Sequence, residues 1–472
     1  MKKTIAIFLS LVLCIGCLIG CKADKEVQQS KKTVADSDDT VVTVWSGDGG
    51  GQAVWEELVD NWNATEGAEK NVFIKWDTIL DATQYDVAQQ NGQLPELVGL
   101  SGTRIKKFQK LGDIIPVEDL PGGKEFLEEY DVPGVEGSNV FDGEQYGVYR
   151  KATTAGLIYN KDLFKKAGIV DKNGEAKAPE SISDIREAAK KIDALGNDIY
   201  GFIFPLKFST NYTIAMQAGN SFSVVEPSIK IDYENLTVSY DGYKDMYGWI
   251  LDLKKDGTLF PGALNLDNDT ARAYFSAGVV GMIPAVSWDV GVYTTQFPAE
   301  CDWDVCQFPV LDGYEFTENS ANLAGGMSIS RTALKNEKTA AATMEAYKFI
   351  YSLNTRKELF KRGVEISCKK DVLESVDESE IDPRLIKFAS FLPDNIKRYP
   401  SETYTIEGEK WDVLFQKVWI GEMSLDDAIT DMETRATAGL RKAVKEGSFD
   451  IAKQLEINAE KIADYEARKA AK

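Results

Sequence analysis

Hydrophobic and polar residues follow two different periods along this chain, one typical of strands and one typical of helices. Segment 41–45 (VVTVW) is rich in β-branched residues and predicts a strand, and segment 46–51 (SGDGGG) predicts a turn. Apolar residues at helical spacing then predict the buried stripe of a helix: Val54, Trp55, Leu58, Val59 and Trp62. A strand, a turn and a helix in this order are typical of the opening of an α/β domain.

The same alternation continues through the rest of the chain. Further strands are predicted at 72–76, 94–100 and 200–204, and further helices at 183–195, 337–353, 424–446 and 451–472. The last of these is rich in Lys, Glu and Ala and is expected to have a solvated face. A chain of 472 residues exceeds what one hydrophobic core usually fills, so we expect two lobes.

The first twenty residues have the pattern of an export signal. Two lysines precede an apolar run at 5–19, and the run ends in Leu-Ile-Gly-Cys at 18–21. This ending resembles a bacterial lipobox, which implies that residues 1–20 are removed and that Cys21 carries lipid on the extracytoplasmic face of the cell membrane. The alternative, an uncleaved transmembrane anchor, needs about 20 apolar residues, more than this run provides. Residues 21–40 are nearly all polar and predict a flexible tether.

Charge and composition exclude several classes of function. The net charge is −21, so phosphate backbones and anionic lipid surfaces are repelled and we expect no nucleic-acid partner. The chain has no histidine, which excludes serine hydrolase triads and histidine-based metal sites. The glycine-rich turn lacks the third glycine of a dinucleotide fingerprint, and we expect a plain turn there. We therefore expect neither a cofactor nor a metal.

The cysteines leave two possibilities open. Three remain after Cys21, and Cys301 and Cys306 bracket a short segment that could turn tightly enough to join them. An exported location permits a disulfide, but buried free thiols are the more favoured reading.

Five further segments, in chain order, carry a family resemblance. They are 91–98 (NGQLPELV), 142–148 (DGEQYGV), 156–169 (GLIYNKDLFKKAGI), 273–289 (AYFSAGVVGMIPAVSWD) and 325–330 (GGMSIS), and a sixth at 421–428 (GEMSLDDA) follows. Together with the opening strand, turn and helix they resemble the extracellular solute-binding proteins of ABC importers, the carbohydrate-binding family that includes maltose-binding protein. The most specific of them is YNKDLFKKAG, and the match spans nearly all of residues 41–445.

The resemblance implies an α/β, two-lobe, periplasmic-binding-protein-like fold with a hinge and an interlobe ligand cleft. The protein would be a membrane-anchored monomer that captures a sugar, expected to be an oligosaccharide, and delivers it to the permease subunits of an ABC transporter. The implied division is lobe 1 at 41–150 plus 315–360, lobe 2 at 155–312 plus 370–450, and a C-terminal helical extension at 451–472.

A sugar presents hydroxyl groups and apolar C–H faces, so its site needs aromatic platforms flanked by polar groups. The resemblance implies such groups in loops from both lobes, with Trp288 and its neighbour Asp289 as the strongest pair. Arg150 stands beside Thr153 at the first crossing between lobes. The candidate ligand contacts are Ser46, Asp48, Ser101, Thr103, Arg104, Thr153, Asn211, Tyr212, Trp288, Asp289, Tyr404 and Trp411.

Two other functions compete with this reading. A surface-anchored glycoside hydrolase also needs aromatic platforms and works with two carboxylates, but the YNKD signature is typical of binding proteins rather than enzymes. A metal or peptide receptor could share the two-lobe plan, but the absence of histidine argues against transition metals and the tryptophan-bearing loops favour sugar.

Overall fold

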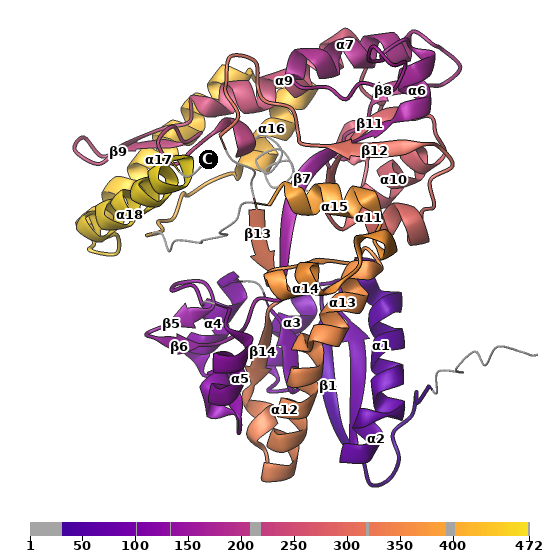
Figure 1. The fold of residues 1–472 in the computed structure, drawn as a ribbon. Coiled ribbons are helices and arrows are strands. Elements are labelled where there is room, and N and C mark those ends of the chain that lie inside the picture. Colours follow the sequence, from indigo (N-terminus) through magenta and orange to yellow (C-terminus); the bar gives the residue numbers. More distant parts are fainter. Residues whose placement is uncertain are drawn as a thin grey trace, which may run out of the picture.

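A computed structural model shows two lobes, one above the other in Figure 1, with strands β7 and β13 running between them. The structure describes residues 31–100, 102–132, 134–207, 219–317, 321–392 and 402–470. The two-lobed α/β fold expected from the sequence is confirmed.

Lobe 1 is built on a five-stranded sheet. Strand β1 is parallel to both β2 and β3, whereas β14 is antiparallel to both β3 and β4. The strand order is β2 (Val72–Thr78), β1 (Thr40–Ser46), β3 (Leu97–Gly99), β14 (Met327–Ser330) and β4 (Ile114–Ile115). A separate hairpin pairs β5 (Val140–Phe141) with β6 (Glu144–Gln145).

The longer helices cover the lobe 1 sheet because they have apolar stripes that must be buried. In α1 this stripe includes Trp55, Val59 and Trp62, as predicted, and α12 packs its own apolar residues against the same core. The helices are α1 (Gln52–Ala64), α2 (Glu66–Lys70), α3 (Thr83–Gln90), α4 (Gly102–Leu111), α5 (Gly123–Tyr130), α12 (Glu337–Tyr351) and α13 (Leu353–Lys361), with short turns η1 (Gly49–Gly51), η2 (Val117–Asp119) and η6 (Arg331–Leu334). After β15 (Ile366–Ser367), α14 (Lys370–Ser375) and η7 (Glu378–Glu380) follow, and Val372 of α14 packs in a core cluster of lobe 2.

Lobe 2 is built on a six-stranded sheet whose central strand is β7. Its main order is β12 (Trp303–Cys306), β7 (Lys151–Asn160), β11 (Val280–Val286) and β8 (Tyr200–Phe202), and β13 (Ala321–Ala324) and β15 (Ile366–Ser367) also pair with β7. A small hairpin, β9 (Lys230–Asp232) and β10 (Thr237–Ser239), packs on α17.

The helices of lobe 2 enclose a large aromatic and aliphatic core. They are α6 (Lys161–Lys166), α7 (Ile182–Asp193), α9 (Gly242–Asp256), α10 (Asn268–Ser276), α11 (Asp289–Gly291), the π-helical turn η5 (Val292–Gln296), α15 (Pro383–Ser390), α16 (Trp411–Ile420), α17 (Leu425–Lys445) and α18 (Ile451–Ala470), with short turns η3 (Gly219–Ser221) and η4 (Ala263–Asn265). In Figure 1, α17 and α18 lie together at one side of this lobe.

The two halves of β7 have different partners, and this difference marks the junction between the lobes. Residues 155–160 pair with β11 and β12 inside lobe 2, whereas residues 151–154 pair with β13 and β15. The chain therefore crosses between the lobes three times in adjacent, hydrogen-bonded strands. We call this region, residues 150–154, 321–324 and 365–367, the crossing.

Most predicted elements form, with changes at their ends. The expected helix 337–353 forms as α12 and ends at Tyr351, because Ser352 adopts an extended conformation and its side chain caps the next helix, α13. The strand expected at 94–100 shortens to β3, Leu97–Gly99. Cys301, Cys306 and Cys368 are free thiols, so the disulfide considered for the first two is wrong and the free-thiol alternative holds.

Candidate functional site

The carboxyl ends of two strands, one from each lobe, meet at the crossing. Ligands of α/β proteins bind in such places because loops there expose polar groups. In lobe 1, β1 ends at Ser46, and Asp48 in the following turn contacts the start of β7. In lobe 2, β11 ends at Val286, and the backbone N–H of Ser287 donates to the carbonyl oxygen of Thr154 at 3.0 Å. Asp48 and Trp288 therefore flank one short stretch of β7.

Four charged side chains form a linked set at the crossing, which we call the ion quartet: Asp48, Lys151, Arg150 and Glu365. The Arg150 guanidinium donates from Nε to both Glu365 carboxylate oxygens, at 2.9 and 3.1 Å, and from Nη2 to Asp48 Oδ2 at 2.8 Å. The Lys151 ammonium donates to Asp48 Oδ1. Two of these side chains are sealed inside, since Arg150 and Glu365 are 0% and 1% exposed, whereas Lys151 and Asp48 keep 13% and 16%.

The quartet fixes the ionisation of Asp48. Burial raises the pKa of its carboxyl, but the positive charges of Lys151 and Arg150 outweigh burial and bring the pKa to about 2. Burial lowers the pKa of Arg150, but the negative charges of Glu365 and Asp48 outweigh burial and raise the pKa above its ordinary value. The guanidinium therefore stays charged. Arg150 also stacks over the Trp55 ring at 4.7 Å. Asp48 is therefore a permanent anion whose orientation is set by two cations.

The glycine-rich turn after β1 is a plain turn, as expected. Its N–H groups are largely used within the loop: Asp48 N donates to Ser46 Oγ, Gly49 N to Gly47 O and Gly51 N to Asp48 O. Ser46 is 1% exposed, so its hydroxyl supports the turn instead of facing a ligand. The Gly50 carbonyl accepts a hydrogen bond from Gln296 Nε2 of lobe 2 at 2.7 Å, which ties the two lobes together beside Asp48.

The start of α4 supplies the other lobe 1 candidates. Thr103 is exposed, and Arg104 donates to Asp86 of α3 at 3.0 Å. Tyr85, next to Asp86, packs edge-on against the Trp45 ring at 5.7 Å, and burial together with the charge of Asp48 raises its pKa to about 12. The Tyr85 hydroxyl is buried without a hydrogen-bond partner in the described part of the chain. Lobe 1 thus places an aromatic pair near Asp48.

Trp288 occupies the turn between β11 and α11 on the lobe 2 side. Its side chain is half-buried, and none of the ring pairs among the described residues includes it. Asp289 holds this turn: its Oδ1 accepts from Arg272 at 3.1 and 2.5 Å, and its Oδ2 accepts from the Val286 N–H at 2.9 Å. Both Asp289 oxygens are engaged inside lobe 2. In this structure Asp289 positions Trp288 and does not face the junction itself.

Two expected contacts lie elsewhere in the fold. Trp411 is 4% exposed at the start of α16 and packs edge-on against Tyr243 and Tyr247, so it belongs to the lobe 2 core. Tyr404 packs against Phe449 near the C-terminal helices. Trp411 is thus buried against other rings, whereas Tyr404 is half-buried with one edge-on ring contact, and a ligand contact at these two positions stays a prediction.

Of the remaining candidates, Thr153 is 2% exposed on β7 at the crossing, opposite Asn322 of β13. Its place is at the junction, within the strand ladder. Ser101, Asn211 and Tyr212 lie outside the described residues, as does Cys21, the expected lipidation site. Within the described ranges no three acidic or cysteine side chains gather as metal ligands, and none of the helices has the length and apolarity to cross a bilayer.

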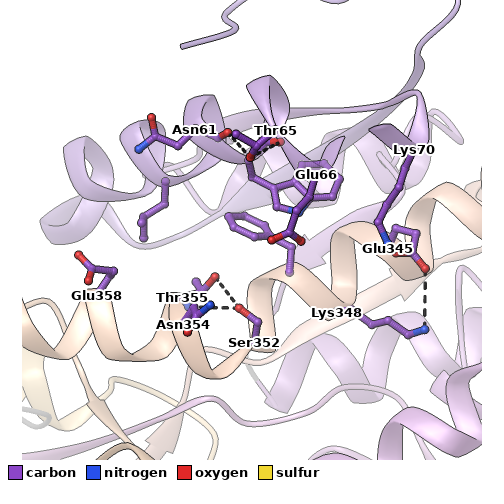
Figure 2. A pocket seen from close by; sticks show the side chains of 13 residues that line it. Asn61, Thr65, Glu66, Lys70, Glu345, Lys348, Ser352, Asn354, Thr355 and Glu358 are labelled. Carbon is purple, nitrogen blue, oxygen red and sulfur yellow. Dashed lines mark hydrogen bonds and ion pairs between the residues drawn. The ribbon is translucent and has the colours of Figure 1, made fainter. Parts of the chain in front are cut away.

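A separate hollow of about 640 Å³ lies on the outer face of lobe 1 (Figure 2). It is enclosed by α1 and α2 on one side and by α12 and α13 on the other, and the Trp62 and Phe349 rings, 5.3 Å apart, are among its lining residues. Among its lining charges, Glu345 pairs with both Lys70 and Lys348. The hollow is thus distinct from the junction. Substitutions of its charged residues can serve as controls for charge substitutions at the junction.

Comparison with known proteins now identifies the family. The model of the bacterial extracellular solute-binding protein family matches residues 34–382, and this chain belongs to that family. Among relatives, a binding protein of Brucella abortus is 23% identical over 385 residues, covering 78% of this chain and 85% of that one. The sn-glycerol-3-phosphate-binding periplasmic protein of the same species is 27% identical over 207 residues, or 43% of this chain and 46% of that protein.

Solved structures share the two-lobed fold. The GacH receptor of Streptomyces glaucescens, studied unliganded and with acarbose, has a TM-score of 0.66 at 17% identity and covers 85% of this chain and 99% of its own. The maltose/maltodextrin-binding domain of Bdellovibrio bacteriovorus, bound to maltotriose, has a TM-score of 0.63 at 18% identity, with 85% and 100% covered. The family and these neighbours are binding proteins.

Sequence reasoning missed three residues of the site. Lys151 and Glu365 were not singled out, because ion pairs between residues 103 and 215 positions apart have no local signal. Tyr85 was not singled out either. The pattern of its helix alone gives no reason to place its hydroxyl near a loop at the end of β1.

Proposed function

We propose that this protein captures a sugar, an oligosaccharide in particular, at the junction between its lobes and delivers it to the permease of an ABC importer. Family membership supports the binding role. Neighbouring structures in the same fold hold acarbose and maltotriose, and another is a chitin oligosaccharide-binding protein. The protein acts as a monomer in this proposal, with lobe closure around the ligand.

The observation that carries the proposal is that Asp48 of lobe 1 and the turn holding Trp288 in lobe 2 both adjoin the first residues of β7 at the crossing. A half-buried indole offers an apolar face to sugar C–H groups, and a carboxylate fixed by two cations accepts hydrogen bonds from hydroxyls. Because the pKa of Asp48 is about 2, its carboxyl stays ionised and supplies no proton to a glycosidic oxygen. The site therefore suits binding without turnover, which disfavours the hydrolase alternative.

The test is a thermal-shift screen of the chain without residues 1–21 against maltotriose, raffinose, chitobiose and their monosaccharides. A ligand that binds only the folded state raises the melting temperature. At a free ligand concentration of one hundred times Kd it adds about 2.7 kcal/mol to the free energy of unfolding. The stabilising sugar is then incubated with the protein and the mixture is analysed by chromatography. Shorter sugar products accumulating with time would support the hydrolase reading instead.

We also propose that Cys21 carries the lipid that holds the protein on the outer face of the membrane. The support is the Leu-Ile-Gly-Cys sequence after an apolar run. Intact-mass measurement of membrane-extracted protein should show loss of residues 1–20 and added acyl mass. A chain that retains its first twenty residues would contradict the proposal.

A further inference from the structure

The ion quartet has two faces with different roles. Arg150 and Glu365 are fully buried and form its inner pair, whereas Asp48 and Lys151 form an outer pair with part of their side chains exposed. All three nitrogen atoms of the Arg150 guanidinium already donate hydrogen bonds within the protein. Nε donates to Glu365, Nη2 to Asp48, and Nη1 to the Gly325 carbonyl at 3.2 Å. Two carboxylates balance two cations.

The hydrogen-bonding capacity that remains is that of an acceptor. Each Asp48 oxygen receives one charged donor, and a carboxylate oxygen has lone pairs for a second. A hydroxyl can donate to it. A phosphate dianion cannot, and it would face a fixed negative charge whose neighbouring cations are already paired.

Two arginines in the candidate loops, Arg104 and Arg272, are also paired. Arg104 is bound to Asp86 at 3.0 Å, and Arg272 to Asp289 at 2.5 Å. Both arginines of these loops thus already bind a carboxylate of the protein. A phosphate-binding site needs the opposite arrangement, with cations or N–H groups that lack a protein anion.

We propose that the charge-balanced ion quartet selects uncharged, hydroxyl-bearing ligands and rejects phosphorylated ones, with Asp48 as the acceptor and Lys151 as the residue that positions it. The inference rests on the proposed function, since it concerns the same site. It sets this chain apart from its glycerol-3-phosphate-binding relative, which matches less than half of it.

The experiment measures selectivity by calorimetry, using the chain without residues 1–21. Maltotriose, raffinose and chitobiose are titrated beside glucose 6-phosphate, maltose 6′-phosphate and glycerol 3-phosphate. We expect the parent protein to bind an uncharged sugar and none of the phosphates at the same concentration. Asp48→Asn keeps the side-chain shape but leaves two cations facing one carboxylate. It should weaken binding of the uncharged sugar about tenfold and give measurable, salt-sensitive phosphate binding.

Two further variants make the result specific. Glu345→Gln is the matched control, because it removes a carboxylate that also faces two lysines, but in the outer hollow of lobe 1 (Figure 2). It should change neither affinity. Lys151→Met removes one of the two cations, so the quartet carries a net negative charge. This variant should still not bind phosphates. If Asp48→Asn proved unstable, phosphate binding by Lys151→Met would by itself overturn the inference.

The outcomes separate the two proposals. A parent protein that binds sugar phosphates as tightly as uncharged sugars would overturn the inference and leave the sugar-binding function standing. So would an Asp48→Asn variant with the selectivity of the parent. If neither kind of sugar binds to the parent protein, the proposed function fails and this inference fails with it.

Discussion

The two sides of the junction use buried ion pairs in opposite ways. On the lobe 1 side the carboxylate of Asp48 faces outward and the buried cation Arg150 holds it from behind. On the lobe 2 side the carboxylate of Asp289 is the inner group, and it holds a turn that presents the Trp288 ring. One lobe thus offers charge and the other an apolar face. A ligand with both hydroxyls and C–H faces satisfies the two together.

The largest expected effect comes from breaking the inner pair of the quartet. Glu365→Ala leaves the Arg150 guanidinium buried with only Asp48 as a charged partner, and loss of one partner of a buried pair costs about 3–5 kcal/mol. Urea denaturation should show this loss. Glu345→Ala, on the outer face of lobe 1, is the control and should cost less than about 1 kcal/mol. Equal losses would mean that the quartet does not stabilise the crossing.

The next largest effect tests the aromatic side. Trp288→Ala should weaken sugar binding by about ten- to a hundredfold, because the ring contributes apolar burial worth roughly 1.5–3 kcal/mol. Stability of the unliganded protein should change less, since the ring is half-buried. Calorimetry with the stabilising sugar measures the affinity. An unchanged Kd would contradict the role of Trp288 and would leave Trp45 and Tyr85 as the candidate aromatic platform.

Trp411→Ala is the control for that variant. Trp411 lies in the lobe 2 core, so truncation should cost about 3–5 kcal/mol of stability while the surviving folded protein binds as before. Trp55 is a poor control, although it lies on the buried stripe of α1 as predicted. Its ring supports Arg150, so its removal would disturb the ion quartet as well.

Acid should remove the contribution that ionised Asp48 makes to stability on the lobe 1 side. The folded-state pKa of Asp48 is lowered from 3.8 to about 2, so its charge stabilises the fold fully above pH 3.8 and this contribution is lost as the pH falls through 2. The shift corresponds to about 2 kcal/mol. Unfolding free energies measured between pH 5 and pH 2 should therefore fall less steeply in Asp48→Asn than in the parent. Parallel curves would show that Asp48 is not held by the quartet.

The sequence predicts the framework better than the site, and particular residues show why. The stripe of α1 and the strand of β1 follow from local periodicity, and both form as expected. The resemblance placed Asp48 and Trp288 at strand ends, and both lie at the crossing. Trp411 and Asp289 were assigned to the ligand on position alone. Their actual partners, Tyr243 and Arg272, are distant in sequence, so only the tertiary structure shows that they are already engaged.

The smallest effect concerns the contact that joins the two sides. Gln296 of η5 donates to the Gly50 carbonyl at 2.7 Å, and this hydrogen bond exists only while the lobes are in the arrangement seen here. Because the Gln296 side chain is exposed, the bond should contribute only about 0.5–1.5 kcal/mol. Gln296→Ala should therefore speed sugar dissociation by about two- to tenfold, with little change in association, which stopped-flow fluorescence can follow. Thr295→Ala, one residue earlier, is the control because its hydroxyl bonds within its own lobe, to the Gly291 carbonyl. Equal dissociation rates in the two variants would mean that this contact plays no part in holding the lobes around the ligand.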